Sequence, residues 1–291
     1  FGATGDLMRN KIVPSLFGLF LQGMLPDKFW VVGFARQDLS DSSFKDHVAS
    51  ILKDKYGSDY QKEQYAFLDM LSYSRGDFAE KDGYKNLAEV LGAIDKGWGV
   101  CTNKLFYLAV PPELYRDIFN NLSESKLSEP CGGKDGWTRV IVEKPFGRDL
   151  DTARELDLML GDKFREDQIY RIDHYLAKEM LQNILSFRFS NNLFENNCSN
   201  ENIERIDVSV LESIGVEERG SFYEGVGALR DVGQNHALQM LALVAMENPV
   251  KMQADAIRKA RAQVFRELRP VASKDRGARV RRGQYTGYRQ E

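Results

Sequence analysis

The chain has 291 residues, of which 43% are hydrophobic and 29% charged, a composition that excludes a disordered or fibrous protein. Its length suits two domains, and its net charge of −3 argues against general binding to nucleic acids and other polyanions. No apolar stretch reaches the roughly 20 residues of a membrane span, so we expect no membrane partner.

The first half of the chain alternates strand-like and helix-like patterns. The spacing of apolar residues predicts helices over Lys11–Gly23, Ser43–Tyr56 and Glu113–Asn121. Short apolar runs predict strands over Phe29–Phe34, Lys104–Val110 and Thr138–Val142. Strands that alternate with helices predict an α/β fold with a mostly parallel, doubly wound sheet.

The pattern changes after Asp149. Helices are predicted over Thr152–Leu160, Tyr175–Asn191 and Leu238–Met246, and a strand over Ile206–Leu211. A further amphipathic helix has one apolar face, made of Ile257, Ala260, Val264 and Leu268. We therefore expect a first domain over residues 1–173 and an α+β domain over residues 174–291.

The three cysteines, Cys101, Cys131 and Cys198, are far apart in the sequence and odd in number. This pattern predicts neither a disulfide framework nor a zinc site, and it suits a reducing compartment, so we expect a cytoplasmic protein. No histidine pair has the spacing of a metal motif either, so no metal is expected.

A glycine-rich segment, Gly2 to Leu7, precedes the first predicted helix. Glycines let a pyrophosphate approach the backbone, and a helix N-terminus offers N–H groups to it. Two glycines alone are more often an ordinary turn, and that alternative stays open.

Arg36 follows the strand Phe29–Phe34. At this position an arginine suits the 2′-phosphate of NADP, whereas an acidic residue suits the ribose of NAD. A solvated surface arginine is the alternative.

Lys144 follows the strand Thr138–Val142, at the end where open parallel sheets bind their ligands. The segment therefore suits a contact with an anion or a substrate oxygen, and the Lys144–Pro145 bond is a candidate for the cis form. The alternative is a proline that merely ends the strand.

Two later segments carry histidines. His174 and Lys178 are four residues apart, which predicts one helix face, and with Tyr175 they would offer donors to a phosphate. An exposed helix start is the alternative. His236 precedes an apolar helix and has the side chain best suited to act as a general base, although a lone buried histidine is more often a hydrogen-bonded core residue. Asp231 lies about 140° from it around a regular helix, a poor geometry for a partner.

Taken together, these segments resemble the glucose-6-phosphate dehydrogenase family along essentially the whole chain. The longest and most specific of them contain RIDHYLAKE and EKPFGRDL. The matching runs are GATGDL (2–7), GFAR (33–36), LFYLAVPP (105–112), VEKPFGRDL (142–150), FREDQIYRIDHYLAKEMLQNILSFRFSN (164–191) and LRDVGQNHALQMLALVAMENP (229–249).

The resemblance implies a Rossmann-like dinucleotide-binding domain followed by an α+β domain with a large, mainly antiparallel sheet. It implies an NADP-dependent oxidoreductase of glucose metabolism that oxidises D-glucose 6-phosphate at C1 to 6-phospho-D-glucono-1,5-lactone in the pentose phosphate pathway. For the full-length protein it implies a homodimer or homotetramer.

The resemblance also assigns residue roles. The dinucleotide site would contain Gly2, Gly5, Asp6, Leu7, Arg36, Tyr107 and Lys144. The sugar phosphate would contact Lys144, His174, Tyr175, Lys178, Glu212 and Asp231. The catalytic residues would be His236, Asp173 and Lys144. His236 would remove the C1 hydroxyl proton as C1 passes a hydride to the nicotinamide, and Asp173 rather than Asp231 would orient it.

The sequence departs from the family pattern at three places. Met8 stands where a small residue is usual, the strand before Gly2 is absent apart from Phe1, and the chain stops inside the second domain. We therefore expect a fragment of a working enzyme, with poor solubility or self-association from an unfinished sheet.

Other functions remain possible at this point. One is another two-domain sugar dehydrogenase, and a second is a non-catalytic dinucleotide-binding homologue or inactive fragment. A nucleic-acid module would rest on residues 251–291, which hold 12 lysines and arginines against four acidic residues. No aromatic stacking platform accompanies that basic segment, so it is the weakest alternative.

Overall fold

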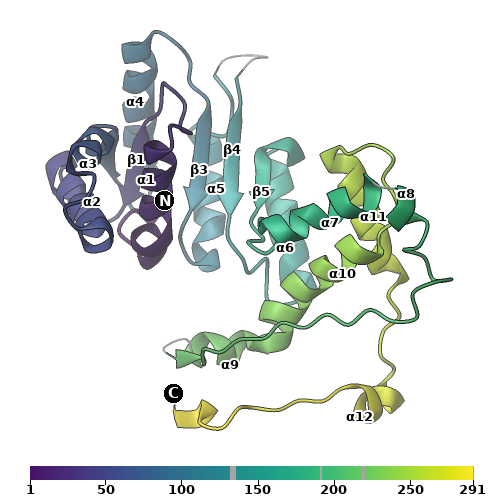
Figure 1. The fold of residues 1–291 in the computed structure, drawn as a ribbon. Coiled ribbons are helices and arrows are strands. Elements are labelled where there is room, and N and C mark those ends of the chain that lie inside the picture. The colour runs from purple at the N-terminus through teal and green to yellow at the C-terminus, as the bar shows by residue number, and fades with distance from the viewer. Residues whose placement is uncertain (132–135, 191, 218–219, 291) are drawn as a thin grey trace. The chain divides into compact units, whose positions relative to one another are not determined.

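The computed structural model describes residues 1–131, 136–190, 192–217 and 220–290 (Figure 1). The chain divides into two compact units, Phe1–Ile172 and Asp173–Glu291. The assignment of residues 1–173 to a dinucleotide-binding domain and of residues 174–291 to a substrate domain stays a prediction. In the described part of the chain, no helix combines the length and the apolar character needed to cross a membrane.

The N-terminal unit is built on parallel strands. The strands are β1 (Val31–Ala35), β2 (Leu71–Arg75), β3 (Lys104–Leu108), β4 (Thr138–Val142) and β5 (Ile169–Arg171). The helices are η1 (Met8–Ile12), α1 (Val13–Leu21), α2 (Asp41–Tyr56), α3 (Gln61–Leu68), α4 (Lys81–Trp98), η2 (Pro112–Leu114), α5 (Tyr115–Glu124), α6 (Leu150–Lys163) and η3 (Glu166–Gln168). This alternation confirms the predicted doubly wound α/β fold.

The chain start lies between two groups of strands. β1 pairs with β2, and β3, β4 and β5 pair in that order. The Phe1 amino group donates to the Tyr107 carbonyl at 2.9 Å, and the Gly2 N–H donates to the Phe34 carbonyl, also at 2.9 Å. Phe1 and Gly2 therefore occupy the position of the central strand, and the order matches that of a Rossmann sheet.

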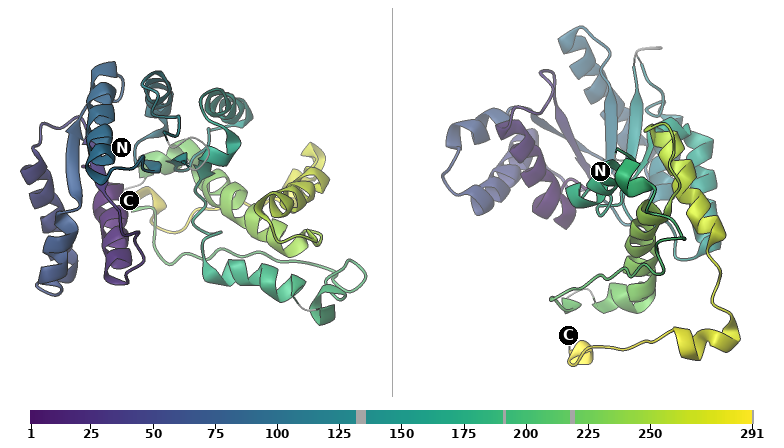
Figure 2. Two further views of the ribbon diagram at one scale, coloured as in Figure 1. Left: turned by 90° about the horizontal axis from the view of Figure 1, so that it is seen from above. Right: turned by 45° about the vertical axis from the view of Figure 1, so that its right-hand side comes forward.

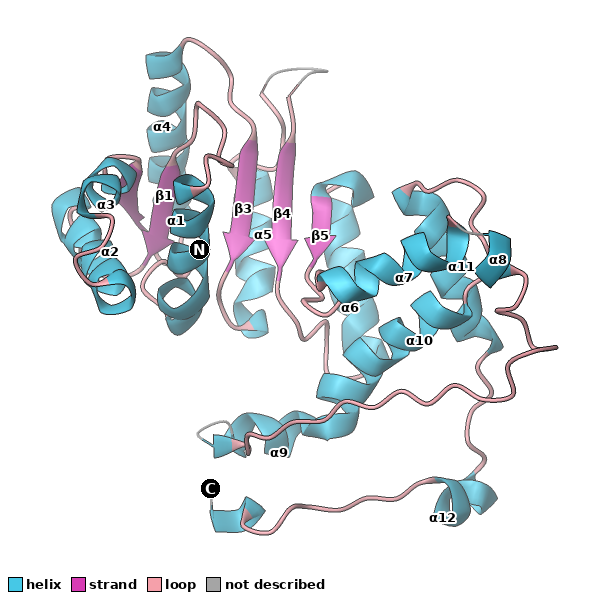
Figure 3. Cartoon of the chain, viewed as in Figure 1, coloured by secondary structure: helices cyan, strands magenta, loops and turns pink. Residues whose placement is uncertain are grey.

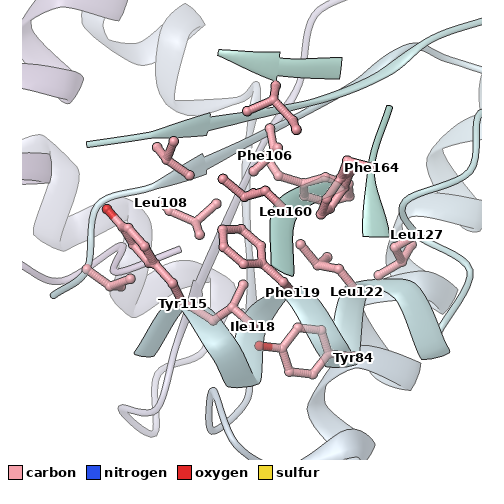
Figure 4. Close-up of a cluster of buried hydrophobic side chains, with 14 of the residues drawn as sticks. Tyr84, Phe106, Leu108, Tyr115, Ile118, Phe119, Leu122, Leu127, Leu160 and Phe164 are labelled. Carbon is pink, nitrogen blue, oxygen red and sulfur yellow. The ribbon is translucent and has the colours of Figure 1, made fainter. Parts of the chain in front are cut away.

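Two hydrophobic clusters flank this sheet. Helices α1, α2 and α3 pack with one another on one face, and α4, α5 and α6 pack on the other (Figure 2). Phe17 and Phe44 are fully buried in the first cluster, and Tyr84, Ile118 and Phe119 in the second (Figure 4). Side chains that bury both faces of the sheet fix the positions of its strand ends, where the candidate site residues lie.

The C-terminal unit consists of helices joined by extended segments (Figure 3). Its helices are α7 (Glu179–Phe189), α8 (Asn192–Glu195), α9 (Gly220–Ala228), η5 (Leu229–Ala237), α10 (Leu238–Ala245), α11 (Ala254–Glu267), η6 (Ser273–Asp275), α12 (Arg276–Arg279) and η7 (Tyr288–Gln290). Helices α7 and α11 both contact α10. Arg188 of α7 is buried and donates to the carbonyls of Leu243 and Met246, which ties α7 to the end of α10.

Three predictions about local structure are wrong. Ile206–Leu211 is extended but forms no strand with any described residue, because an alternating segment becomes a strand only beside a hydrogen-bonding partner. The helix predicted from Tyr175 begins at Glu179. A disulfide joins Cys101 to Cys131, which the sequence spacing did not predict.

Candidate functional site

The glycine segment forms a tight turn at the carboxyl end of the sheet. The Gly5 N–H donates to the Gly2 carbonyl at 3.0 Å, and helical residues follow from Asp6. Gly2 has φ +77°, and a Cβ atom there would lie 2.3 Å from the Ala109 carbonyl oxygen. Only glycine fits this position, so the backbone comes close to the neighbouring strand and leaves the start of the helix facing the same edge.

Arg36 follows directly after β1 and is exposed. Because all the strands are parallel, the end of β1 lies at the same edge of the sheet as Lys144, which follows β4. This edge of the sheet therefore carries the start of a helix, the guanidinium group of Arg36 and the ammonium group of Lys144. Backbone N–H groups and positive side chains are the donors that a pyrophosphate and a 2′-phosphate require, so the predicted cofactor residues fit NADP chemically.

The segment after β4 is held by two tyrosines. The Tyr115 hydroxyl donates to the Glu143 carbonyl at 3.1 Å and accepts from the Glu143 N–H at 3.2 Å. The Tyr107 hydroxyl donates to the Glu143 carboxylate. The Lys144–Pro145 bond is cis, as its sequence allowed. These contacts fix the backbone of Glu143, and thereby the point from which Lys144 extends.

Burial governs the ionisation of both tyrosines. It raises the pKa of Tyr115 to about 12, and the carboxylates of Glu143 and Glu113 add to the rise. Burial also raises the pKa of Tyr107, and the hydrogen bond to Glu143 adds to it. Both hydroxyls therefore remain protonated donors across the physiological range.

The predicted histidine–aspartate pair lies in the C-terminal unit. The His236 Nδ1 atom lies 2.8 Å from an Asp173 carboxylate oxygen, and His236 is 1% exposed. A carboxylate can only accept, so Nδ1 carries the hydrogen and Nε2 is the basic nitrogen of the neutral ring. The same Asp173 oxygen accepts from the Tyr175 N–H at 3.0 Å. One carboxylate thus orients the ring and shapes the turn that carries Tyr175.

Two rings contact the histidine of this pair. The Tyr175 ring stacks on His236 with centroids 4.1 Å apart, and His174 meets His236 edge-on at 4.6 Å. The Lys178 ammonium lies 3.9 Å from the centre of the Tyr175 ring. His174 and Lys178 are exposed. The structure therefore brings together the predicted phosphate ligands, although on a turn and not on one face of a helix.

The turn has a local cause. The Asp173 side chain accepts a hydrogen bond from the Tyr175 N–H, two residues ahead, and the Lys178 N–H donates to the Tyr175 carbonyl at 3.0 Å. An aspartate that bonds the backbone two residues ahead favours a turn over a helix. Helix α7 consequently begins after Lys178, at Glu179.

The remaining predicted sugar ligands lie in the same unit. Asp231 is buried in η5. Because η5 is a π-helix, Asp231 and His236 lie about one turn apart, and the angle of about 140° expected for a regular helix does not apply. Burial raises the pKa of Tyr175, and the carboxylates of Glu212, Asp173 and Asp231 raise it further. Glu212 and Asp231 are therefore electrostatic neighbours of the Tyr175 hydroxyl.

Sequence reasoning missed two groups near these residues. Arg261 of α11 interacts electrostatically with Asp173, while burial and Arg258 lower its pKa. A signal for it exists in the sequence, because Arg261 is four residues after Ile257 and so lies beside the apolar face of the predicted helix. Tyr115 was assigned no role, and nothing in the sequence places its hydroxyl at Glu143.

Two clusters among the described residues have the donors and spacing to hold a metal ion. They consist of Asp95, Cys101 and Cys131, and of Asp173, His174 and His236. In the second cluster the carboxylate already bonds His236, which leaves a histidine oriented to accept a proton. The arrangement can therefore deprotonate a hydroxyl group placed beside the turn that carries His174 and Tyr175.

Comparisons with known proteins agree with these features. The family model described as "Glucose-6-phosphate dehydrogenase, NAD binding domain" matches residues 1–183, and the C-terminal domain model matches residues 185–291. The first model covers the segment that carries the glycine turn, Arg36 and Lys144. The N-terminal part of the chain thus matches the NAD binding domain of that family.

Individual relatives carry the same name. Glucose-6-phosphate 1-dehydrogenase of Chlamydia muridarum is 38% identical and matches 100% of this chain and 59% of its own length. That of Dictyostelium discoideum is 42% identical, over 98% of this chain and 55% of its own. The chain thus spans somewhat more than half the length of the curated relatives it matches.

Solved structures match the fold as well. A glucose-6-phosphate dehydrogenase in complex with its substrate glucose-6-phosphate aligns with a TM-score of 0.86 and 38% identity, over 94% of this chain and 56% of that one. The Mycobacterium avium glucose-6-phosphate 1-dehydrogenase aligns with a TM-score of 0.87 and 35% identity, over 100% and 60%. On these matches to its sequence and fold, the chain belongs to the glucose-6-phosphate dehydrogenase family.

Proposed function

We propose that the protein represented by this chain oxidises D-glucose 6-phosphate at C1 to 6-phospho-D-glucono-1,5-lactone, with NADP as cofactor. The observation that carries the proposal is the 2.8 Å hydrogen bond between His236 and Asp173, beside the turn that carries Tyr175. A buried histidine with an oriented ring is the group needed to take the proton of a sugar hydroxyl.

The proton transfer uses residues of the C-terminal unit. Nε2 of His236 accepts the C1 hydroxyl proton, and the Asp173 carboxylate stabilises the imidazolium that forms. His174, Tyr175 and Lys178 bind the 6-phosphate through imidazole, phenol and ammonium donors. Glu212 and Asp231 accept hydrogen bonds from the sugar hydroxyls.

The cofactor is held by residues of the N-terminal unit. The turn at Gly2 and Gly5 and the helix start at Asp6 and Leu7 bind the pyrophosphate, while Arg36 binds the 2′-phosphate. Tyr107 and Lys144 are the ligands on the nicotinamide side, and Lys144 also binds the sugar. When bound, NADP supplies the hydride acceptor, and the protein supplies orientation and charge.

The test is the absorbance at 340 nm of the purified chain with glucose 6-phosphate, once with NADP and once with NAD. His236→Asn should lower the rate by about 10²–10⁴ because the base is removed. Arg36→Ala should lower the NADP-to-NAD preference by about tenfold or more, since a charge-assisted bond to phosphate is lost.

The same assay on a chain extended at both ends separates two explanations of an inactive protein. Activity that appears only in the extended chain supports the reaction and assigns the loss to missing residues. An extended chain that folds but reduces neither cofactor contradicts the proposal and favours a non-catalytic dinucleotide-binding homologue.

A further inference from the structure

The disulfide between Cys101 and Cys131 lies at the amino end of the sheet, away from the edge that carries Lys144. Cys101 lies three residues before β3, and Cys131 lies between α5 and β4. Both cysteines are exposed, and their Cα atoms are 5.8 Å apart. That separation falls in the usual range for disulfides, so the backbone can hold the reduced and the oxidised pair without moving.

Hydrogen bonds fix the chain around both cysteines. The Asp95 carboxylate accepts from the Thr102 N–H at 3.0 Å and from its hydroxyl at 2.5 Å, which holds the residue after Cys101. The Trp137 N–H donates to the Asn103 side chain at 2.8 Å, and this contact joins the segments that lead into β3 and β4. The segment after Cys101 and the entry into β4 are therefore placed by contacts other than the disulfide.

A positive charge lies beside one of the sulfur atoms. The Lys104 ammonium is 3.4 Å from Cys131 Sγ and 2.7 Å from the Asp95 carboxylate, and its side chain is 10% exposed. Asp95 opposes this charge at 3.5 Å from Cys131 Sγ and at 4.0 Å from Cys101 Sγ. The cation lies against Cys131, and a nearby cation favours the reactive thiolate.

The same residues argue against a metal site. The donor atoms of Asp95, Cys101 and Cys131 are within reach of one ion. The Lys104 ammonium already binds the Asp95 carboxylate, however, and a metal ion there would meet a like charge at close range. The site accordingly favours sulfur chemistry over coordination.

We propose that Cys101 and Cys131 form a reversible redox site that exchanges with low-molecular-weight disulfides such as glutathione disulfide, with Cys131 as the sulfur that attacks first. This proposal is independent of the dehydrogenase reaction. The bond closes a loop across a sequence separation of 30 residues, so the disulfide form is expected to be the more stable one.

The exchange proceeds in two balanced steps. The Cys131 thiolate attacks one sulfur of glutathione disulfide, forms a mixed disulfide and releases one glutathione thiolate. The Cys101 thiolate then attacks the Cys131 sulfur, forms the protein disulfide and releases the second glutathione. The two protein thiols lose two electrons and two protons overall, and glutathione disulfide gains them. Reduction reverses the order: a glutathione thiolate attacks the Cys131 sulfur and releases the Cys101 thiolate, and a second glutathione thiolate then attacks the glutathione sulfur of the mixed disulfide and releases the Cys131 thiolate beside Lys104.

The first experiment measures the equilibrium in the Cys198→Ser chain, which leaves only the two cysteines of the site. Incubation with mixtures of reduced and oxidised glutathione, followed by alkylation and mass spectrometry, should show conversion from a doubly alkylated to an internally bridged form. Chains that stay dithiol at every ratio, or that carry glutathione on both cysteines, would overturn the proposal. Stoichiometric zinc binding that blocks the exchange would overturn it in favour of a metal site.

The second experiment tests the order of attack. In the same background, Cys131 of the Cys101→Ser variant should react with glutathione disulfide faster than Cys101 of the Cys131→Ser variant. Lys104→Gln should slow Cys131 by about two- to fivefold, whereas Lys104→Arg, which keeps the charge, should restore the rate. Cys131 that reacts no faster than Cys101 would contradict its role as the attacking sulfur, and a Lys104→Gln variant that folds and reacts at the unchanged rate would contradict the effect assigned to the ammonium group.

Discussion

The two units hold their candidate functional groups in different ways. At the sheet edge of the N-terminal unit, both backbone groups of Glu143 bond the Tyr115 hydroxyl, and its side chain bonds Tyr107. In the C-terminal unit, the His236 ring bonds the carboxylate of Asp173, and the Tyr175 ring stacks on it. The first arrangement is fixed by hydrogen bonds to the backbone of Glu143, whereas in the second a carboxylate bonds the ring nitrogen that sets the tautomer of His236.

This difference has a consequence for substitutions. Strand ends are placed by a hydrogen-bonded sheet and by the clusters packed on its faces, so the loss of one side-chain contact leaves other contacts in place. A histidine on a helix can rotate about its side-chain bonds, and the hydrogen bond to its second nitrogen sets its tautomer. We therefore expect the chemistry to be sensitive at Asp173 and tolerant at Tyr107.

The largest expected effect is that of Asp173→Asn. The asparagine oxygen can still accept from the Tyr175 N–H, so the turn is kept, but its amide no longer stabilises an imidazolium at His236. The rate of NADP reduction should fall by about 10²–10⁴, with the unfolding midpoint nearly unchanged. Tyr107→Phe is the matched control, and its rate should stay within about tenfold of the parent. Equal losses in the two variants would remove the distinction between the units.

The next largest effect concerns the cluster that places the sheet edge. Phe119 is fully buried, and its ring contacts those of Tyr115 and Phe164 (Figure 4). Phe119→Ala should lower the free energy of unfolding by about 3–5 kcal/mol because it leaves a cavity. Leu158→Ala on α6, where the side chain is 75% exposed, should change it by about 0.5 kcal/mol or less. Urea unfolding measures both, and similar losses would show that the cluster does not support the unit.

The sequence predicts the sheet well where apolar runs are unbroken. The strand Thr138–Val142 has the predicted bounds, because every second residue, namely Thr138, Val140 and Val142, is buried. β2 was missed because its pattern is polar, with Ser72 and Ser74 buried between larger residues. β5 has three residues, too few for a period to emerge. The pattern of polar and apolar residues within a short segment does not show that helices far away in the sequence will bury that segment.

The site shows a similar limit. Resemblance to a family supplied the pairing of His236 with Asp173, which no local pattern could supply because the two residues are 63 positions apart in the sequence. The disulfide was missed because the distance between Cys101 and Cys131 depends on the parallel pairing of β3 with β4. The roles assigned to the cofactor and substrate ligands stay predictions until activity is measured.

The smallest expected effect is a pH dependence of the N-terminal unit. Burial raises the pKa of Tyr115 to about 12, above its ordinary value near 10, so the folded state holds this proton more tightly than the unfolded state does. The contribution of Tyr115 to stability is therefore fully present below about pH 10 and is lost as the pH rises toward 12. One such group can lower the free energy of unfolding by about 1.4 kcal/mol per pH unit at most.

Tyr115→Phe tests this dependence at the contact that fixes Glu143. At pH 8 the variant should be less stable by about 1–3 kcal/mol, because two backbone groups of Glu143 lose their partner. Between pH 10 and 12 its stability should fall less steeply than that of the parent chain, although Tyr84 and Tyr107, whose pKa values burial also raises, keep part of the slope. Guanidinium unfolding at several pH values measures both quantities. Parallel curves for parent and variant would mean that Tyr115 ionises in the folded chain as it does in water, and that its hydroxyl is not the buried clamp on Glu143.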